Sequence, residues 1–478
     1  MLSGGVPPHP RPPQVVIPER ACYDDGMSQA TLIRGGTVCL PDGPARVDVR
    51  LEDGRIAEVG EALAEPAAAE VIDAGGLWLL PGMTDLHVHL DDRIGPWVLA
   101  DTWTTGSEAA LVEGITTLGG FVTQGPQETL AAAVDRAAAK AAGRSHCDYF
   151  WHLTPTRFDR AGWEEIAAQL RRGFRTFKFY TTYREAGLYT SYRELAEILG
   201  RLRDTGARSL VHCEDEDVLD EAAGLHRATG SARDHALRRP VLAELTAVLQ
   251  LIEIAAATGA PVHVVHVSTG AAAAAIARAR ERALVTAETA PHYLFLDETL
   301  LKRVDGYRWL CTPPLRPAAE ASALRRAALV GAVDLFATDH CAYRRTDKET
   351  GLRGLAWAPY GVAGIGALVP LVYRAFGDCP ETGLPELAKY LALRPAQVAG
   401  LYPRKGAIQA GADADIVLVD GSGPERPIRS SVADTWETYP GMTTRLAVRA
   451  VWRRGRLVAG DGALLEPDAP GGECLCLK

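Results

Sequence analysis

Short apolar segments that end in polar residues alternate with helical segments through the middle of the chain. There are eight such segments: LWLLPGMTDLHVH, GITTLGGFV, CDYFWHLTP, FRTFKFYTTY, ARSLVHCEDE, PVHVVHVST, ALVTAETAPHYLF and DLFATDH. Helical stretches rich in Ala, Leu and Arg, such as ETLAAAVDRAAAKAAGRS, separate them. A strand followed by a helix, repeated eight times over about 320 residues, predicts a (β/α)8 or TIM barrel.

Both ends of the chain have a different pattern, in which short strands are separated by turns. The N-terminal part contains ARVDVRLEDGRIAEVG, where the Asp-Gly pair predicts a hairpin. The C-terminal segments ADIVLVD and LAVRAVWRRGRLVAGDG have the same character. We therefore predict an α/β protein. Its barrel spans residues 79–401, and a small β-sandwich domain combines residues 27–78 with residues 402–478.

The composition indicates a soluble globular protein. Of the 478 residues, 47% are hydrophobic and 23% are charged, and the net charge of −9 argues against a nucleic-acid-binding protein. No apolar run approaches the roughly 20 residues that span a membrane. The nine cysteines are scattered without a CxxC pair, so we expect a cytoplasmic location. Residues 1–26 are rich in Pro and Gly and lack periodicity, which predicts a disordered leader before Met27.

Candidate metal ligands gather at the ends of five predicted strands. His87 and His89 are two residues apart, so a strand would point both imidazoles to one side, as suits a divalent transition metal. The other candidates end later strands: Lys178, His212, His266 and Asp339. Any one of them alone is more often structural. Six at the rim where TIM barrels carry their chemistry indicate a metal-dependent active site.

Lys178 is unusual in this set because an ammonium group has no lone pair for a metal. It fits if its amine reacts with CO₂ to form a carbamate, an anionic carboxylate that can bridge two metals. The alternative is a lysine in a salt bridge. Its apolar surroundings, TFKFY, argue against a solvated lysine, since burying an unpaired charge is costly.

These residues lie in a larger set of motifs that resembles a known family. The motifs are PGMTDLHVHLD, ADTWTTGSEAALVEGITTLGGFV, CDYFWHLTP, FKFYTTY, VHCEDEDVLDE, VVHVST, TPPLR, ATDH and GLYPRKGAIQAGADADIVLVD. Between Thr31 and Asp461 the sequence resembles the cyclic amidohydrolases, in the hydantoinase/dihydropyrimidinase branch.

The resemblance implies a binuclear zinc site. His87, His89 and Asp339 would bind the more buried zinc ion, His212 and His266 the other, and carboxylated Lys178 would bridge both. All of these positions are intact. The family also implies a homotetramer or a homodimer.

The resemblance also implies a reaction. A metal-bridging hydroxide attacks the carbonyl of a cyclic amide, such as a hydantoin or dihydropyrimidine ring. Asp339 accepts the proton of the water and later delivers it to the leaving ring nitrogen. The metal and the phenol of Tyr183, five residues after the lysine, stabilise the oxyanion.

Several positions bear on the substrate. Dihydroorotases carry an Arg where this chain has Asp91, and they usually lack the tyrosine at Tyr183, so both positions favour the hydantoinase branch. The backbone of Thr312 is expected to hold the substrate amide. In the segment PYGVAGIG, Tyr360 replaces a substrate-contacting Asn and Gly366 replaces a Glu.

The loop after the HxH pair is apolar in hydantoinases, but here it contains Asp92 and Arg93. We predict that Arg93 contacts a polar or charged arm of the substrate. The alternative is that Asp92 and Arg93 pair with each other at the surface.

Two other functions stay open from the sequence. One is an allantoinase-like enzyme, or a specialised-pathway amidohydrolase for a lactam or cyclic imide, working in the hydrolytic or the cyclising direction. The other is a non-enzymatic dihydropyrimidinase-like scaffold. Such scaffolds have usually lost metal ligands, whereas this chain keeps all six.

Overall fold

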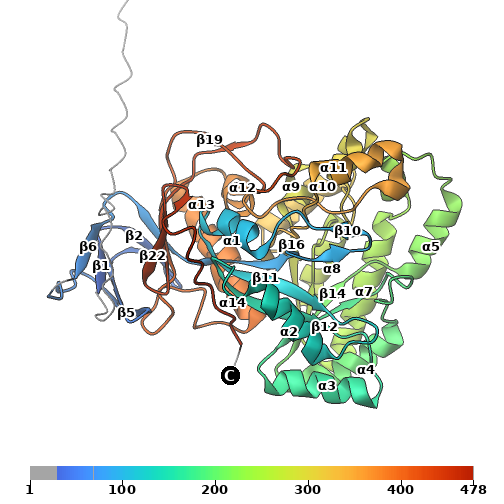
Figure 1. The fold of residues 1–478 in the computed structure, drawn as a ribbon, viewed down its shortest axis with the longest axis horizontal. Coiled ribbons are helices and arrows are strands. Elements are labelled where there is room, and N and C mark those ends of the chain that lie inside the picture. The colour runs from blue at the N-terminus through green and yellow to red at the C-terminus, as the bar shows by residue number, and fades with distance from the viewer. Residues whose placement is uncertain (1–29, 68, 477–478) are drawn as a thin grey trace, which may run out of the picture.

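Eight parallel strands form the central sheet of the protein, whose computed structural model describes residues 30–67 and 69–476 (Figure 1). Their spatial order is β17-β16-β15-β14-β13-β12-β11-β8. The strands are β8 (Met83–Val88), β11 (Ile115–Thr123), β12 (Asp148–Thr154), β13 (Thr176–Tyr180), β14 (Arg208–His212), β15 (Val262–Val264), β16 (Val285–Thr289) and β17 (Leu335–Phe336). Each lies within one of the eight apolar segments, except that β11 extends one residue beyond its segment, to Thr123. The predicted leader, residues 1–26, lies outside the described residues.

The first and last strands close this sheet into a barrel. Val88 in β8 forms a parallel bridge with His340, which follows β17, and the next N–H, that of His89, donates to the His340 carbonyl over 2.8 Å. Strand β11 can approach β8 because Gly119 lacks a side chain, since a Cβ there would lie 2.6 Å from the Leu86 carbonyl oxygen. The predicted (β/α)8 barrel is confirmed.

Helices connect the strands and surround the barrel (Figure 1). Side-chain caps fix where several of them begin: Ser191 and Glu194 form a capping box at α4, and Asp215 and Thr269 cap α5 and α8. The helices are α1 (Trp103–Leu111), α2 (Leu130–Ala141), α3 (Arg160–Arg171), α4 (Tyr192–Leu202), α5 (Glu216–Leu225), α6 (Arg233–Leu237), α7 (Val241–Thr258), α8 (Gly270–Ala279), α9 (Pro291–Phe295), α10 (Ala318–Leu329), α11 (Arg345–Glu349), α12 (Leu368–Ala375), α13 (Pro380–Leu387) and α14 (Arg394–Ala399).

Helix α7 is long and apolar enough to span a membrane by length and composition. It packs against α4 and α8, however, and its buried side chains recur at helical spacing, as with Ala247, Leu251 and Ala255. A buried apolar stripe on an otherwise exposed helix is typical of the outer helices of a barrel. We therefore interpret α7 as an outer helix of the barrel whose apolar stripe packs on the protein core.

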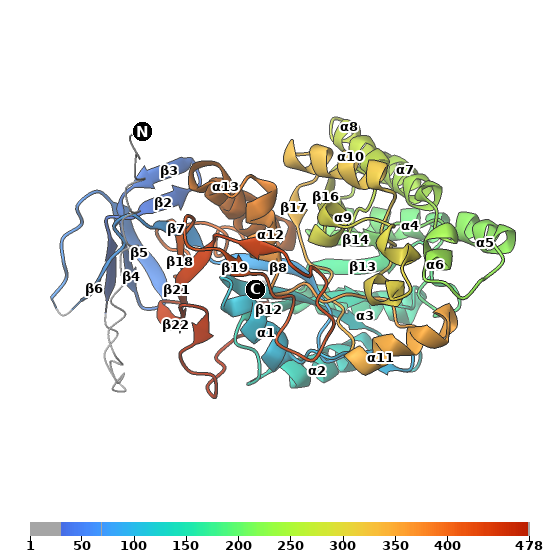
Figure 2. The same ribbon diagram turned by 90° about the horizontal axis from the view of Figure 1, so that it is seen from above.

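A smaller unit beside the barrel combines both ends of the chain (Figure 2). Its two sheets have the orders β5-β4-β1-β6 and β23-β22-β21-β18-β7-β2-β3. The strands are β1 (Thr31–Arg34), β2 (Thr37–Leu40), β3 (Gly43–Arg46), β4 (Asp48–Glu52), β5 (Arg55–Gly60), β6 (Glu70–Asp73), β7 (Trp78–Pro81), β18 (Ile416–Asp420), β21 (Ala447–Arg453), β22 (Arg456–Gly460) and β23 (Ala463–Leu464).

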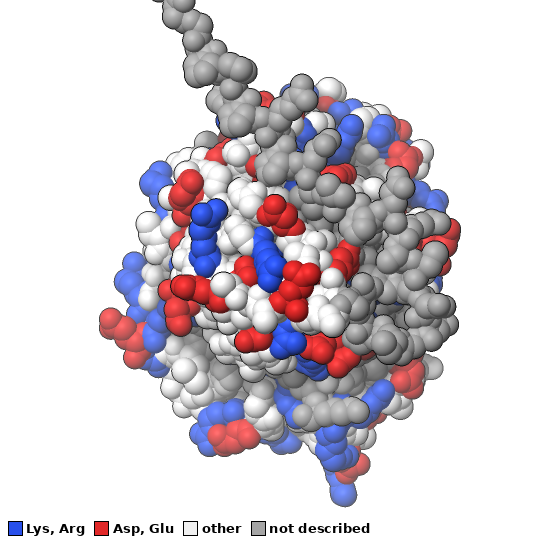
Figure 3. All heavy atoms as spheres, turned by 90° about the vertical axis from the view of Figure 1, so that its left-hand side faces the viewer, with Lys and Arg blue, Asp and Glu red and all other residues white. Residues whose placement is uncertain are grey.

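One hydrophobic cluster holds the two sheets together. It includes Ile33 and Val49 from the first sheet and Leu79 and Leu418 from the second. Because β18 pairs with β7, the two ends of the chain share one sheet, as the predicted sandwich requires. On the face of this unit drawn in Figure 3, acidic and basic side chains are interspersed, which is typical of a solvated surface.

The chain passes from the small unit to the barrel within the first apolar segment. Strand β7 belongs to the small sheet and β8 to the barrel, so the expected boundary between residues 78 and 79 falls inside β7. Gly82 joins the two strands at a place with no room for a side chain. A Cβ there would lie 2.3 Å from Thr116 Oγ1 and 2.7 Å from Asp415 Cβ, so only glycine fits without a rearrangement.

The last described residues return to the barrel. The Tyr149 N–H donates to the Glu473 carbonyl over 2.9 Å, and the Leu475 N–H donates to the Tyr149 carbonyl over 2.7 Å. Leu475 is buried with Leu86 and Phe150 in a cluster of barrel residues. The C-terminal part of the chain therefore contributes strands to the small unit and then packs against the barrel.

Candidate metal centre

The ten residues selected from the sequence as site residues all line one cavity of about 1320 Å³, at the carboxyl ends of the barrel strands. Six are the candidate metal ligands: His87, His89, Lys178, His212, His266 and Asp339. The other four are Tyr183, Thr312, Tyr360 and Arg93. The barrel thus brings together side chains that lie up to 273 positions apart in the chain, from His87 to Tyr360, because its parallel strands all end at one rim.

The first group of donors consists of His87, His89 and Asp339, whose ligand atoms all lie within 4.8 Å of one another. Asp339 Oδ1 is 3.2 Å from His87 Nε2 and 3.6 Å from His89 Nε2. The other ring nitrogen of His87, Nδ1, contacts Glu288 Oε1 at 2.5 Å. A carboxylate beside Nδ1 keeps the imidazole proton on Nδ1. The lone pair is then on Nε2, the nitrogen that faces Asp339, as in metal-binding histidines.

The second group consists of His212 and His266, whose rings meet edge-on with 4.5 Å between their centroids. His212 Nε2 contacts Glu214 Oε2 at 2.8 Å, which leaves Nδ1 for a ligand. The ring of His266 lies 5.5 Å from that of His87, so the two groups adjoin. Two adjoining donor groups fit two metal ions.

The protonation of these groups also suits a metal. Burial lowers the pKa of His87, His212 and His266, so these imidazoles are neutral at pH 7. Burial would raise the pKa of Asp339, but the neighbouring His87 and His89 hold it below its usual range. Neutral imidazoles with a carboxylate are a donor set that zinc prefers.

Lys178 is buried, with 1% of its surface exposed, and its Nζ lies over the rings of Phe121 and Tyr180 at 5.3 and 5.1 Å. Within the described part of the chain, no carboxylate forms an ion pair with it. Burial lowers the pKa of Lys178 to about 8, while Glu288 and Asp339 act in the opposite direction. A substantial neutral fraction is what an amine needs to react with CO₂, so the residues present fit the expected metal centre.

Three residues of the cavity adopt left-handed backbone conformations, although none is glycine. The φ angles are 69° for Tyr183, 37° for His266 and 49° for Asp339. Such conformations are uncommon for residues with a Cβ and concentrate at functional sites, where the surrounding structure holds them in place.

The model of the amidohydrolase family matches residues 78–458 of the chain. The chain belongs to the amidohydrolase family. Among curated proteins, a D-hydantoinase from Streptomyces coelicolor is 35% identical to it over 405 residues, which cover 82% of this chain and 86% of that protein. A D-hydantoinase from Ralstonia pickettii is 30% identical over 449 residues, which cover 92% and 97% of the two chains.

Solved structures of the same branch superimpose on this amidohydrolase. A D-hydantoinase aligns with a TM-score of 0.88 and 29% identity, covering 94% of this chain and 99% of that one. The dihydropyrimidinase from Brevibacillus agri NCHU1002 aligns with the same TM-score and coverage at 30% identity. The predicted family, fold and enzymatic nature of the chain are confirmed.

Two buried carboxylates that support the histidines escaped the sequence analysis. Glu288 contacts His87 and, at 3.1 Å, His263, and it accepts the His266 N–H at 3.3 Å, so it touches both donor groups. Glu214 supports His212 in the same way. Glu288 lies in the last two residues of β16, and Glu214 comes two residues after β14. The candidate ligands occupy similar positions at strand ends, so the same criterion would have identified both acids from the sequence.

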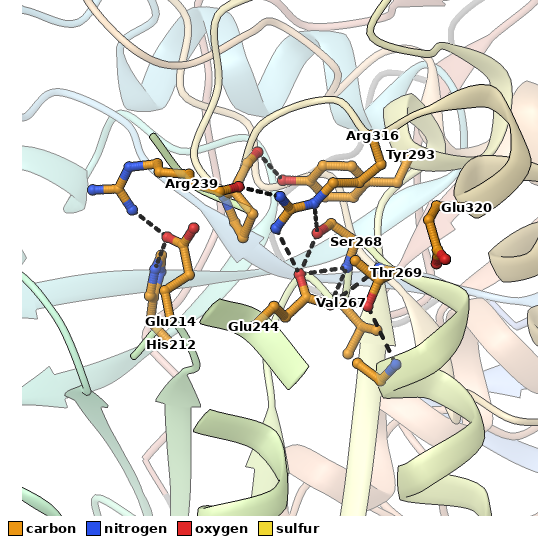
Figure 4. Close-up of polar contacts among 12 residues, drawn as sticks. His212, Glu214, Arg239, Glu244, Val267, Ser268, Thr269, Tyr293, Arg316 and Glu320 are labelled. Carbon is orange, nitrogen blue, oxygen red and sulfur yellow. Dashed lines mark hydrogen bonds and ion pairs between the residues drawn. The ribbon is translucent and has the colours of Figure 1, made fainter. Parts of the chain in front are cut away.

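Figure 4 shows how Glu214 extends this support to the start of α7. Glu214 forms an ion pair with Arg239, whose guanidinium lies 5.4 Å from the ring centroid of Tyr183. Arg316 donates to the Arg239 carbonyl and to Ser268 Oγ. One chain of polar contacts thus connects the second donor group with the segment that follows His266.

Glu244, in the first turn of α7, completes the chain. It accepts the N–H groups of Ser268 and Thr269 over 3.1 and 3.0 Å, and Arg316 lies 3.4 Å from it. The amidohydrolase therefore holds the ends of β14 and β15 through the start of α7 (Figure 4).

A stacked aromatic pair, Tyr360 and His235, also lines the cavity, and only Tyr360 was expected there from the sequence. Tyr360 stacks on His235 with 4.4 Å between ring centroids and 9° between planes. His235 Nε2 contacts the Cys311 carbonyl at 2.8 Å and Thr312 Oγ1 at 3.2 Å. Gly366, by contrast, lies outside the cavity lining and packs on Arg429, whose carbonyl a Cβ would approach to 2.7 Å.

Arg93 lies at the rim of the cavity, on the short hairpin of β9 (Arg93–Ile94) and β10 (Trp97–Val98). Its backbone N–H donates to Asp92 Oδ1, but the Asp92 carboxylate approaches Lys140 at 3.8 Å. Among the described residues, none offers a carboxylate within ion-pair distance of the Arg93 side chain. The alternative of an Asp92–Arg93 side-chain pair is therefore absent from the structure.

We expect Glu214→Gln to lower kcat/KM for a hydantoin by about 10- to 100-fold, because a neutral amide holds His212 and Arg239 less firmly. Steady-state kinetics will measure the loss. Glu253→Gln is the matched control, since Glu253 also pairs with an arginine, Arg282, but on the surface, and it should behave as wild type. A Glu214→Gln enzyme within twofold of wild type would contradict the supporting role.

Proposed function

We propose that this amidohydrolase opens a cyclic amide, a hydantoin- or dihydropyrimidine-like ring, by metal-assisted hydrolysis. The observation that carries the proposal is the pair of adjoining donor groups around the buried Lys178, with which no carboxylate of the described residues forms an ion pair. The names of the similar proteins, D-hydantoinase and dihydropyrimidinase, support the choice of ring.

The donors would hold two zinc ions. His87, His89 and Asp339 would bind one, His212 and His266 the other, and Lys178 as a carbamate would bridge them. When bound, such ions supply Lewis acidity, which lowers the pKa of a water molecule and polarises a carbonyl group. The buried position of Lys178 between the two groups supports its bridging role.

Asp339 would carry the proton. Its carboxylate accepts a proton from the attacking water and then delivers it to the ring nitrogen as the amide bond breaks. His87 and His89 keep Asp339 ionised by holding its pKa below the usual range, so it starts the cycle as a base.

Tyr183 would stabilise the oxyanion that forms on the ring carbonyl. Burial raises the pKa of the Tyr183 phenol far above its usual range, although Arg239 acts in the opposite direction. The phenol therefore stays protonated and donates a hydrogen bond. The Thr312 backbone, held beside His235, is the proposed partner of the ring amide.

The rim would select a ring with a polar or charged arm. Arg93 lines the cavity without a carboxylate partner among the described residues, and a guanidinium binds carboxylate or ureido groups through two hydrogen bonds. A specialised lactam or cyclic imide is the second candidate substrate. The reason is that Tyr360, which stacks on His235 in the cavity wall, replaces the Asn of the hydantoinase pattern. We further propose a cytoplasmic homodimer or homotetramer.

The metal centre can be tested directly. Protein produced with added zinc and bicarbonate should contain about two zinc ions per chain and a carbamate on Lys178. Lys178→Met should lose at least one ion, because the bridging carboxylate is gone. Lys140→Met removes another lysine of the cavity and should keep both ions. Elemental analysis will measure the content, and less than one zinc in wild type would rule out a binuclear site.

Asp339→Asn tests the proton transfer. The side chain keeps its size, so circular dichroism should show an unchanged fold, whereas turnover should fall by about 10²- to 10⁴-fold. Activity within threefold of wild type on the best ring substrate would remove Asp339 from the catalytic role.

A substrate panel with Arg93→Ala tests the specificity. We expect KM for a carboxylate-bearing hydantoin to rise more than kcat falls, because the contact is remote from the reacting carbonyl. Phenyl- and isopropyl-hydantoin should be poor substrates and should be unaffected by the change. Arg136→Ala is the control, since Arg136 also lines the cavity but pairs with Glu128 at 2.9 Å. Equal turnover of polar and apolar rings, unchanged in Arg93→Ala, would refute a polar pocket.

A further inference from the structure

A second cavity, of about 450 Å³, lies where the small unit meets the C-terminal segment. Five of its ten lining residues are arginines: Arg55, Arg404, Arg453, Arg454 and Arg456. None of its residues lines the candidate metal centre. We refer to it as the arginine cavity.

Two tight turns bring four of these arginines together, and the fifth, Arg404, comes from the segment after α14. One joins β4 to β5 and the other joins β21 to β22. The turns touch: a Cβ on Gly54 would lie 3.2 Å from the Arg454 carbonyl, and a Cβ on Gly455 would lie 3.3 Å from the Gly54 Cα. Gly54 and Gly455 have φ angles of 74° and 75°, which glycine adopts without strain. The backbone thus fixes the wall from which the arginines project.

The carboxylates of the lining are too few for these cations. They are Asp53, Asp413 and Glu473, three against five guanidinium groups. Asp413 is shared, because it lies 2.6 Å from Arg55, 3.0 Å from Arg404 and 3.0 Å from Lys405. Glu473 pairs with Arg454, which also lies 3.5 Å from Asp148, and Arg456 pairs with Glu466. Two carboxylates outside the lining therefore balance part of its charge, and within the described part of the chain Arg453 is the one lining arginine without a carboxylate at ion-pair distance.

Arg453 is the lining arginine whose positive charge is least compensated. Only 5% of its surface is exposed, and its one hydrogen bond goes to the His146 carbonyl. Among the described residues, no carboxylate lies within ion-pair distance of it, and its Nε has no hydrogen-bond partner. Burial lowers the pKa of Arg453, which Asp148 partly offsets and the adjacent Arg454 lowers further. A buried guanidinium without a counter-ion is costly, and an anion in the cavity would remove that cost.

We propose that the arginine cavity binds a compact oxyanion with two or more negative charges, of the phosphate or polycarboxylate class. The planar guanidinium fork donates two parallel hydrogen bonds to such an anion, and several forks around one cavity favour a multiply charged ligand over chloride. The site is independent of the ring-opening reaction.

Binding at this place has a structural consequence. Arg55 and Arg453 belong to the small unit, whereas Arg404 follows α14, which packs on the barrel residues Leu86 and Phe150. A bound oxyanion would hold these parts together. Because a ligand that binds only the folded state stabilises it, the melting temperature should rise with the concentration of the anion.

The test uses full-length, zinc-loaded protein with inorganic phosphate as the probe and chloride at equal ionic strength as the reference. Thermal unfolding and isothermal titration calorimetry should both show saturable binding of phosphate. The double variant Arg404→Gln/Arg456→Gln should bind at least tenfold more weakly. These two side chains lie at the partly exposed rim, so the fold should persist, and Arg453→Met then probes the buried position.

Arg282→Gln is the matched control. Arg282 pairs with Glu253 outside the cavity, and 49% of its side chain is exposed, against 48% for Arg456. It should bind phosphate as wild type does.

A further variant distinguishes phosphate bound in the arginine cavity from phosphate bound at the metal centre. Lys178→Met should keep the stabilisation by phosphate if the arginine cavity is the site. Stabilisation that survives in Arg404→Gln/Arg456→Gln but disappears in Lys178→Met would overturn the proposal. So would an equal response of the wild type to phosphate and to chloride.

Discussion

Closure of the barrel depends on one buried carboxylate, that of Asp85. It accepts the Thr338 N–H at 3.0 Å, the Thr338 hydroxyl at 2.5 Å and the His87 N–H at 3.2 Å. Burial raises the pKa of this carboxyl group to about 7, although its hydrogen bonds with Thr338 and His87 act in the opposite direction. An intramolecular hydrogen bond contributes about 1 kcal/mol, so the three together favour the register in which the first and last strands meet. That register sets Asp339 against His87 and His89. Without it, the first group of donors would not exist.

The donors themselves are held by a second layer of carboxylates. Glu288 fixes His87 and the backbone of His266, Glu214 fixes His212, and Glu244 fixes the segment after His266. Each of these acids is buried, and each is stabilised by the hydrogen bonds it accepts, since a buried carboxylate without partners would be strongly destabilising. The same bonds keep the imidazoles in the orientation that metal binding requires. The conformational strain at His266 and Asp339 is tolerable because their surroundings are fixed in this way.

The substrate side of the cavity is built differently. The metal-binding side is anchored to the barrel strands, whereas Arg93 lies on the short hairpin that begins with β9, His235 on the short helix α6 and Tyr360 in the loop before α12. Changes in such connecting parts disturb the barrel least. The departures from the hydantoinase pattern fall on this side. Gly366 is an exception, because it packs on Arg429 outside the cavity and concerns folding rather than substrate. The candidate metal ligands thus follow the hydantoinase pattern, whereas residues at the rim of the cavity depart from it.

The sequence by itself determined the eight barrel strands, the two β-rich ends and the residues that line the metal centre. These features follow from local periodicity and from the rule that parallel strands end at one rim, and neither requires knowledge of distant contacts. Tertiary structure alone decided that the first apolar segment divides between two sheets at Gly82, that Leu475 returns to the barrel, and that the Asp92 carboxylate turns toward Lys140 instead of Arg93. It also decided which acids support which histidines. The physical reason is that a buried ionic contact joins residues far apart in the chain, and the choice among possible partners is made by packing and desolvation, which no local pattern records.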